Sequence, residues 1–130
     1  MTILGIDYGT KRIGVALSDT SEVLAFPKET IQNNKKALEA LKEICVKEKA
    51  RLIVLGHSKD SQGNDNPVME KIHPFKAELE TTLAIPVIFE QESWSSVEAT
   101  RFQGMNENID ASAAAIILQR FLDKQRETRK

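Results

Sequence analysis

The chain has 130 residues, of which 41% are hydrophobic and 28% charged, and its net charge at pH 7 is −1. These values predict one globular domain, residues 1–130, and exclude a chain-wide basic field for nucleic acid. No apolar run approaches the ~20 residues of a membrane-spanning helix, and no signal-peptide pattern opens the chain. The single Cys45 cannot form an internal disulfide, so we expect a cytoplasmic protein without membrane contact.

The first 26 residues predict three strands. Residues 2–7 form an apolar run typical of a buried strand, and residues 13–18 predict a second strand paired with the first as a hairpin. Residues 21–26 predict a third strand that Pro27 would stop.

The middle of the chain alternates helix and strand. Asn33 and Asn34 can cap a helix that reaches about residue 50, with Leu38, Leu41, Ile44 and Cys45 on its buried face. Residues 52–55 predict a central parallel strand ending at Gly56, and the polar residues 57–66 predict a loop.

A second helix is expected from Pro67, with a buried stripe formed by Met69, Ile72, Phe75, Leu79 and Leu83. Residues 85–89 predict another strand, a capping box at Ser95 and Glu98 predicts a helix that ends before Gly104, and residues 111–122 predict a last helix. The resulting order, β-β-β-α-β-α-β-α-α, indicates an α/β fold with a mixed sheet flanked by helices.

Asp7 is an acidic residue at the end of an apolar strand. If the strands starting at residues 2, 52 and 85 are parallel neighbours, their carboxyl ends bring Asp7 close to Glu90 and Glu92, and Asp110 could reach the same edge. Three carboxylates repel one another unless a positive charge lies among them, and hard oxygen ligands suit Mg²⁺ or Mn²⁺. This pattern predicts a divalent-metal site.

Each acid also has a structural interpretation that the sequence leaves open. Asp7 can cap a hairpin turn, Glu92 can be a solvated loop residue, and Asp110 is a favoured residue before a helix. Strand alternation places Glu90 and Glu92 on the same side, so either could be the ligand.

Other polar residues give weaker signals. Lys11 and Arg12 at the hairpin tip can be solubilising or can hold phosphates beside a metal site. His57 and His73 lie in separate segments without metal-ligand spacing, which favours surface or core roles. Trp94 can stack on a base, but packing is the better interpretation.

Four motifs resemble the YqgF/RuvX family, whose members are called Holliday junction resolvases or pre-16S rRNA nucleases. They are GIDYGTKRIGVALSD at residues 5–19, VLG at 54–56, PVIFEQESWSSVEA at 86–99 and DASAAAIILQRFLD at 110–123. The resemblance covers essentially the whole chain and implies a ribonuclease H-like fold. It also implies a metal-dependent nuclease that hydrolyses phosphodiester bonds, using Mg²⁺ or Mn²⁺.

Carried over by position, the implied catalytic and metal-binding acids are Asp7, Glu92 and Asp110. These are the acids that the strand ends and the last helix already singled out. The implied nucleic-acid contacts are Gly9, Thr10, Lys11, Arg12 and Ser95.

The chain departs from the family pattern beside these acids. Gln91-Glu92-Ser93 stands where the family usually has Asp-Glu-Arg, and the segment before Asp110 is short and lacks basic residues. The expected function is 5′-end processing of pre-16S rRNA by a monomer or weak homodimer. The alternatives are a resolvase of branched DNA and a catalytically weakened protein that binds nucleic acid or nucleotides.

Overall fold

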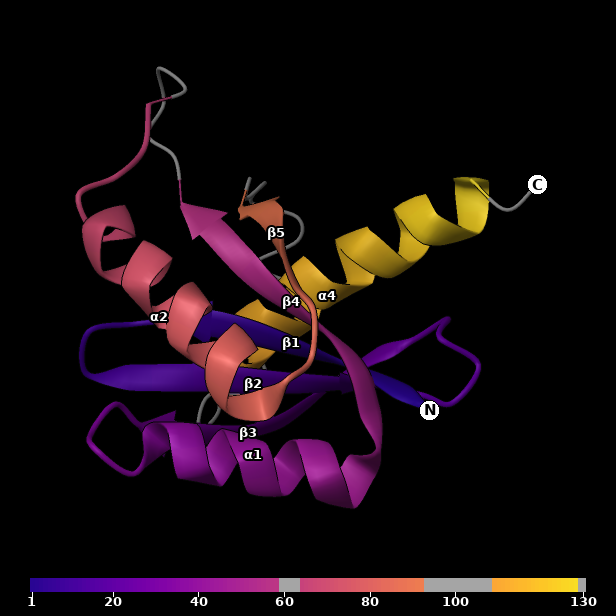
Figure 1. The fold of residues 1–130 in the computed structure, drawn as a ribbon. Helices are drawn as coiled ribbons and strands as arrows, with labels where there is room; N and C mark the ends of the chain where they lie inside the picture. The colour runs from indigo at the N-terminus through magenta and orange to yellow at the C-terminus, as the bar shows by residue number, and fades with distance from the viewer. Residues whose placement is uncertain (59–63, 93–108, 129–130) are drawn as a thin grey trace.

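The computed structural model describes residues 1–58, 64–92 and 109–128, which form a sheet with helices on both faces (Figure 1). The five strands lie in the order β3-β2-β1-β4-β5. They are β1 (Thr2–Tyr8), β2 (Arg12–Ser18), β3 (Ala25–Gln32), β4 (Ala50–Ser58) and β5 (Val87–Glu92). The described helices are α1 (Ala37–Glu48), α2 (Met69–Leu83) and α4 (Ile109–Thr128). The predicted α/β architecture is confirmed, and the helix expected from residue 95 lies outside the described residues.

The direction of the strands makes the sheet mixed. β1 pairs antiparallel with β2, and β2 pairs antiparallel with β3, as the predicted hairpin requires. β1 and β4 are parallel, and so are β4 and β5. The carboxyl ends of β1, β4 and β5 therefore share one edge of the sheet, where open α/β folds bind their ligands.

Each face of the sheet has its own core, because neighbouring residues of a buried strand point to opposite faces. Leu4 and Ile6 of β1 belong to the cluster that packs under α1 and α2, which lie in front of the sheet in Figure 1. Ile3 belongs to the cluster under α4, behind the sheet. The predicted stripe of α2 is confirmed, with four of its five side chains buried: Met69, Ile72, Phe75 and Leu79.

The close contact between α4 and β1 depends on Gly5. A Cβ at Gly5 would lie 2.8 Å from Leu118 Cβ and 3.0 Å from the Ala114 carbonyl oxygen. Real side chains essentially never come this close, so glycine is required for the helix to lie against the strand.

The predicted end of the third strand at Pro27 is wrong. β3 runs from Ala25 to Gln32 and passes through Pro27. β3 is an edge strand, and proline lacks only a backbone donor that need not be paired at an edge. A bulge opposite Val15 and Ala16 leaves Lys28 without a register partner, and such features also protect an edge from pairing with other chains.

Other element boundaries also differ from those expected. β4 continues through His57 to Ser58, and β5 continues through Glu90 to Glu92, so the two strands remain paired beyond their apolar residues. α4 begins at Ile109 and extends to Thr128. Apolar runs mark the buried part of an element, but backbone pairing carries the element further.

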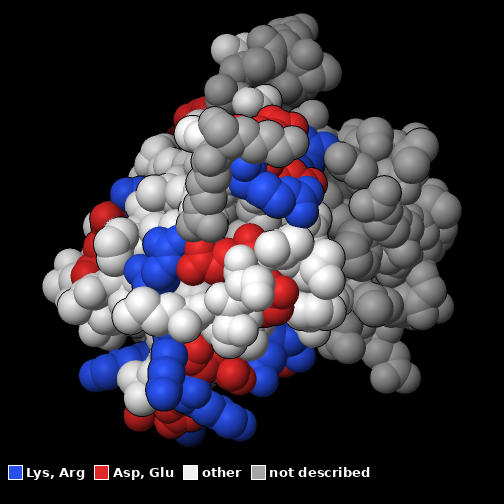
Figure 2. Space-filling model, turned by 90° about the vertical axis from the view of Figure 1, so that its right-hand side faces the viewer, with Lys and Arg blue, Asp and Glu red and all other residues white. Residues whose placement is uncertain are grey.

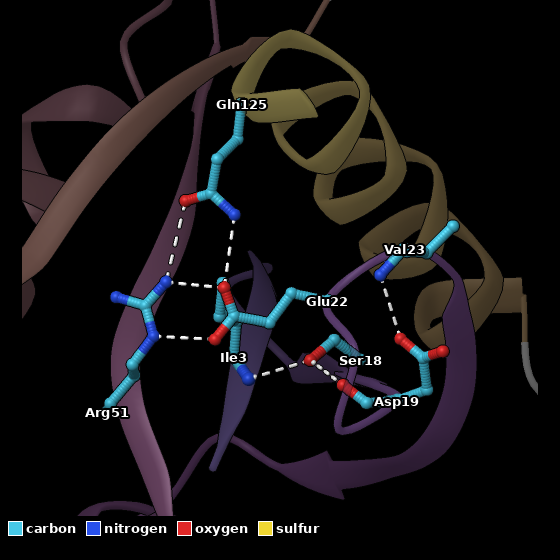
Figure 3. A network of polar contacts seen from close by, with 7 residues as sticks. All are labelled: Ile3, Ser18, Asp19, Glu22, Val23, Arg51 and Gln125. Carbon is cyan, nitrogen blue, oxygen red and sulfur yellow. Dashed lines mark hydrogen bonds and ion pairs between the residues drawn. The ribbon is translucent and has the colours of Figure 1, made fainter. Parts of the chain in front are cut away.

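A network of hydrogen bonds joins the loop between β2 and β3 to β4 and α4, near the amino ends of the central strands (Figure 3). Arg51 of β4 donates to both carboxylate oxygens of Glu22, at 2.6 and 2.5 Å, and Gln125 of α4 donates to the same carboxylate at 3.1 Å. The hydrogen bond to Glu22 raises the pKa of the Arg51 guanidinium. Asp19 caps the same loop by accepting from the Val23 N–H at 2.8 Å.

Figure 2 shows the face of the molecule turned to the right in Figure 1. Among the described atoms of this face, basic and acidic groups are interspersed and do not form a patch of one sign. Within the described ranges, no helix is long and apolar enough to cross a membrane.

Candidate active site

Asp7 lies near the carboxyl end of β1, at the edge that the parallel strands share. Its neighbour Ile6 is in register with Leu55 of β4, which is in register with Phe89 of β5. One residue further, Asp7 reaches the level of Gly56 and Glu90. Asp7 is half-buried and pairs with Gly14 across the hairpin.

Asp7 faces the α4 side of the sheet, because it is two residues beyond Gly5, which contacts α4. α4 runs away from this edge, since Ala114 meets Gly5 whereas Gln119 bonds to Ala25, at the other end of the sheet. The first turn of α4, which contains Asp110, therefore lies toward the carboxyl end of β1.

Glu92 is the last residue of β5 and is in register with Ser58 of β4. The backbone of Glu92 thus ends at the same edge as β1. The side chains of Glu92 and Asp110 lie outside the described residues, and so does the whole of Ser95. Asp110 lies inside the first turn of α4. The capping interpretation required Asp110 to precede the helix.

Glu90, the other acid that could serve as a ligand, already has a basic partner. Glu90 is 5% exposed, and its carboxylate accepts a hydrogen bond from Lys124 Nζ of α4 at 2.6 Å. A carboxylate neutralised by a lysine is a weaker ligand for a cation than one without such a partner. This contact weakens the case for Glu90 as the ligand, and the choice of Glu92 stays a prediction.

The hairpin tip between β1 and β2 holds the other candidate residues. Thr10, Lys11 and Arg12 are exposed. Gly9 is required by the tightness of the turn, because a Cβ there would lie 2.5 Å from the Arg12 carbonyl oxygen. The tip can present basic side chains beside the edge that carries Asp7.

Asn33 contacts this tip, a role that sequence reasoning missed by grouping Asn33 with Asn34 as a helix cap. Asn33 Nδ2 donates to the Gly9 carbonyl oxygen at 2.8 Å. Asn34 Oδ1 accepts from the Lys36 N–H at 2.9 Å, in the turn before the helix. The N-cap residue of α1 is Lys36 and has no side-chain capping bond, so the predicted asparagine cap is wrong. The local sequence does not distinguish the roles of these two asparagines. Asn33 lies beside the tip only because β3 pairs with β2.

Sequence reasoning also missed a cluster around Asp65, because its histidines come from separate segments. His57 Nε2 lies 2.8 Å from Asp65 Oδ1, and His73 Nε2 lies 4.0 Å from Asp65 Oδ2. Both imidazole rings contact the Phe89 ring, with centroids 5.0 and 5.5 Å apart. The cluster lies on the α2 side of the sheet, the face opposite to that of Asp7.

The metal site expected at this edge stays a prediction. Within residues 1–58, 64–92 and 109–128, no three His, Cys, Asp or Glu side chains are grouped so as to hold a metal ion. The carboxylates of Glu92 and Asp110 lie outside the described side chains. The donor types fit Mg²⁺ or Mn²⁺, which prefer carboxylate oxygens.

Cys45 is a buried packing residue, as predicted, and is 3% exposed. Burial raises the pKa of its thiol to about 11, so the sulfur is protonated and unreactive at neutral pH.

The sequence is similar to those of known proteins. The model of the RuvX family, described as Holliday junction resolvase, matches residues 1–124. A "Putative pre-16S rRNA nuclease" of Caldanaerobacter subterraneus is 36% identical over 139 residues, covering 98% of this chain and 100% of the relative. A protein of the same name from Thermoanaerobacter pseudethanolicus is 36% identical and covers 97% of this chain and 99% of the relative.

Solved structures share the fold at low sequence identity. RuvC of T. thermophilus, in complex with a Holliday junction substrate, superposes with a TM-score of 0.61 at 13% identity, covering 98% of this chain and 97% of that chain. The Holliday junction resolvase of fowlpox virus gives a TM-score of 0.58 at 14% identity, covering 95% of this chain and 99% of that chain.

These similarities confirm the ribonuclease H-like fold and the nuclease class that the motifs implied. The family match begins at residue 1 and continues through most of α4, so it includes every element that carries a candidate acid. The chain therefore belongs to the RuvX family of Holliday junction resolvases.

Proposed function

We propose that this protein is a metal-dependent nuclease that hydrolyses phosphodiester bonds of pre-16S rRNA, in the processing of its 5′ end. The observation that carries the proposal is the half-buried Asp7 near the carboxyl end of β1, at the edge of the sheet where β5 also ends and toward which the first turn of α4 lies. The names of full-length relatives support the substrate class.

Asp7, Glu92 and Asp110 would hold Mg²⁺ or Mn²⁺ through their carboxylates. When bound, such an ion supplies positive charge to the phosphate oxygens, where negative charge develops during hydrolysis. The half-buried setting of Asp7 strengthens its electrostatic interactions relative to those in bulk water. Lys124 neutralises Glu90 and so keeps an additional buried negative charge from opposing an incoming phosphate.

Gly9, Thr10, Lys11, Arg12 and Ser95 would bind the substrate backbone. In the exposed hairpin tip, Lys11 supplies a point charge and Arg12 a planar guanidinium that can bind a phosphate through two hydrogen bonds. A nuclease of ribosomal precursors would act in the cytoplasm, where ribosomes are assembled, and we propose that it acts as a monomer or weak homodimer.

The second candidate is a resolvase of branched DNA. The description of the matching family and the junction-bound structural neighbour favour this alternative. A third candidate, a protein that binds nucleic acid and cleaves it weakly, follows from Gln91 and Ser93, which replace an acid and an arginine of the family pattern.

The test is cleavage of a pre-16S rRNA fragment and of a four-way DNA junction, each with Mg²⁺ or Mn²⁺ and with EDTA. We expect metal-dependent cleavage of the RNA by the wild type and its loss in Asp7→Asn, which removes a charge but little volume. The control is Glu39→Gln, an exposed carboxylate of α1.

The cleavage and binding results distinguish the three candidate functions. Cleavage of the junction alone would overturn the RNA substrate in favour of the second candidate. Activity of Asp7→Asn close to that of the wild type would remove Asp7 from the site. Binding of RNA by the wild type without cleavage would favour the third candidate.

A further inference from the structure

Asn33, which follows β3, is bonded to both ends of the hairpin tip between β1 and β2. Its side-chain Nδ2 donates to the Gly9 carbonyl oxygen at 2.8 Å, and its backbone N–H donates to the Lys11 carbonyl oxygen at 3.0 Å. The first bond joins residues 24 positions apart. One half-buried residue of the edge strand's connection to α1 therefore fixes the tip from outside the hairpin.

These bonds determine how the tip is oriented. In a trans peptide the N–H points away from the carbonyl oxygen of the same unit, and none of the peptide bonds that the structure describes is cis. Because the Gly9 carbonyl is directed at Asn33, the Thr10 N–H is directed away from it. Lys11 follows in the same short turn and is exposed. Asn33 thus donates hydrogen bonds to the Gly9 and Lys11 carbonyl oxygens, which would otherwise repel an anion.

The side chain of Asn33 suits this role for a chemical reason. The Gly9 carbonyl needs a donor, which the amide nitrogen of asparagine provides and the ionised carboxylate of aspartate does not. The tip itself is too tight to adjust freely, since Gly9 already lies against the Arg12 carbonyl oxygen. Loss of the donor would leave the turn closed but its orientation less restricted.

We propose that Asn33 is a positioning residue for substrate binding, which holds the hairpin tip so that Lys11 and Arg12 meet the phosphates of the nucleic acid. This inference rests on the proposed function, since it assumes that the tip contacts the substrate backbone. Asn33 does not touch the substrate and acts through the tip. Its loss therefore weakens binding and raises KM while kcat changes little.

The experiment measures the Kd of a fluorescent pre-16S rRNA fragment in EDTA, together with the melting temperature of every variant. We expect Asn33→Ala to weaken binding about fivefold, the usual effect of one hydrogen bond. Asn33→Asp should bind at least as weakly, because it lacks the donor. Thr82→Ala, which alters an exposed side chain of α2 away from the tip, is the control and should bind like the wild type.

A double-mutant cycle separates positioning from a general structural role. In the background Lys11→Ala with Arg12→Ala, Asn33→Ala should cause no further loss, because the groups that it positions are absent. An equal further loss in that background would overturn the proposal. So would binding by Asn33→Ala at wild-type strength while the Lys11/Arg12 double variant binds weakly.

Failure of the proposed function gives a different pattern. If the wild type binds RNA but does not cleave it, nuclease activity fails while the binding cycle still tests Asn33. If the Lys11/Arg12 double variant binds like the wild type, the tip is not the phosphate-binding surface and the positioning role is overturned with it.

Discussion

The Nζ atom of Lys124 lies 2.6 Å from Glu90 Oε2 and joins the last helix to the edge strand β5. The two groups differ sharply in exposure, since the side chain of Glu90 is 6% exposed and that of Lys124 is 65% exposed. The consequence is an asymmetry between the partners. Removing the lysine leaves a buried charge without this partner, whereas removing the acid leaves a lysine that water can solvate.

We therefore predict that Lys124→Met lowers the free energy of unfolding by about 1–3 kcal/mol. Glu90→Gln should cost less, because the buried amide is uncharged. Urea unfolding of both variants measures the difference, with Lys71→Met on the exposed side of α2 as the control. Equal losses in the two variants would show that the carboxylate does not depend on Lys124.

The contact between Gly5 and α4 gives a second prediction. Gly5→Ala would place a Cβ against the Leu118 Cβ and the Ala114 carbonyl, neither of which is the end of a flexible side chain. We expect α4 to shift and the stability to fall by about 1–3 kcal/mol. The shift would also displace Asp110 and reduce cleavage. A melting temperature equal to that of the wild type would contradict the close packing.

A third prediction concerns the ion pair between Arg51 and Glu22 (Figure 3). Glu22→Gln removes the charge from a carboxylate that accepts bonds from both Arg51 and Gln125, and we expect a loss of about 1–2 kcal/mol. Lys28→Ala, which breaks a more exposed pair with Glu48, should cost less than about 1 kcal/mol. Chemical denaturation of both variants tests whether the Arg51–Glu22 pair contributes more to the free energy of unfolding than the Lys28–Glu48 pair.

The thiol of Cys45 predicts a loss of stability in alkali. Burial raises its pKa from 9.0 to about 11, so above pH 9 the unfolded chain gives up this proton before the folded chain does. The stabilisation is complete below pH 9 and is lost as the pH rises to about 11, by at most about 3 kcal/mol. The free energy of unfolding of the wild type and of Cys45→Ala is measured from pH 7 to 11. The difference between the two gives the contribution of the thiol, since the variant lacks this group. Parallel pH profiles would contradict the prediction.

The acids proposed for the site stand out locally in the sequence, and their role stays a prediction. Asp7 is conspicuous as a carboxylate that follows a buried apolar run, and the parallel strands that carry it and Glu92 were recognisable from their composition. The sequence did not separate Glu90 from Glu92. The sequence also could not show that Glu90 is paired with Lys124, which lies 34 residues beyond Glu90 and reaches it only when α4 crosses the sheet.

The sequence by itself determined the elements with a clear apolar pattern, which are the continuous buried run of β1 and the periodic stripe of α2 that begins at Met69. It also determined the mixed sheet, since apolar runs separated by helices favour parallel strands. Only the tertiary structure decided where β3 ends, because Pro27 is tolerated once β3 is an edge strand. It likewise decided that Asn33 meets Gly9, because that contact depends on strand register. Local patterns encode burial and period, whereas distant partners are set by pairing and packing between elements.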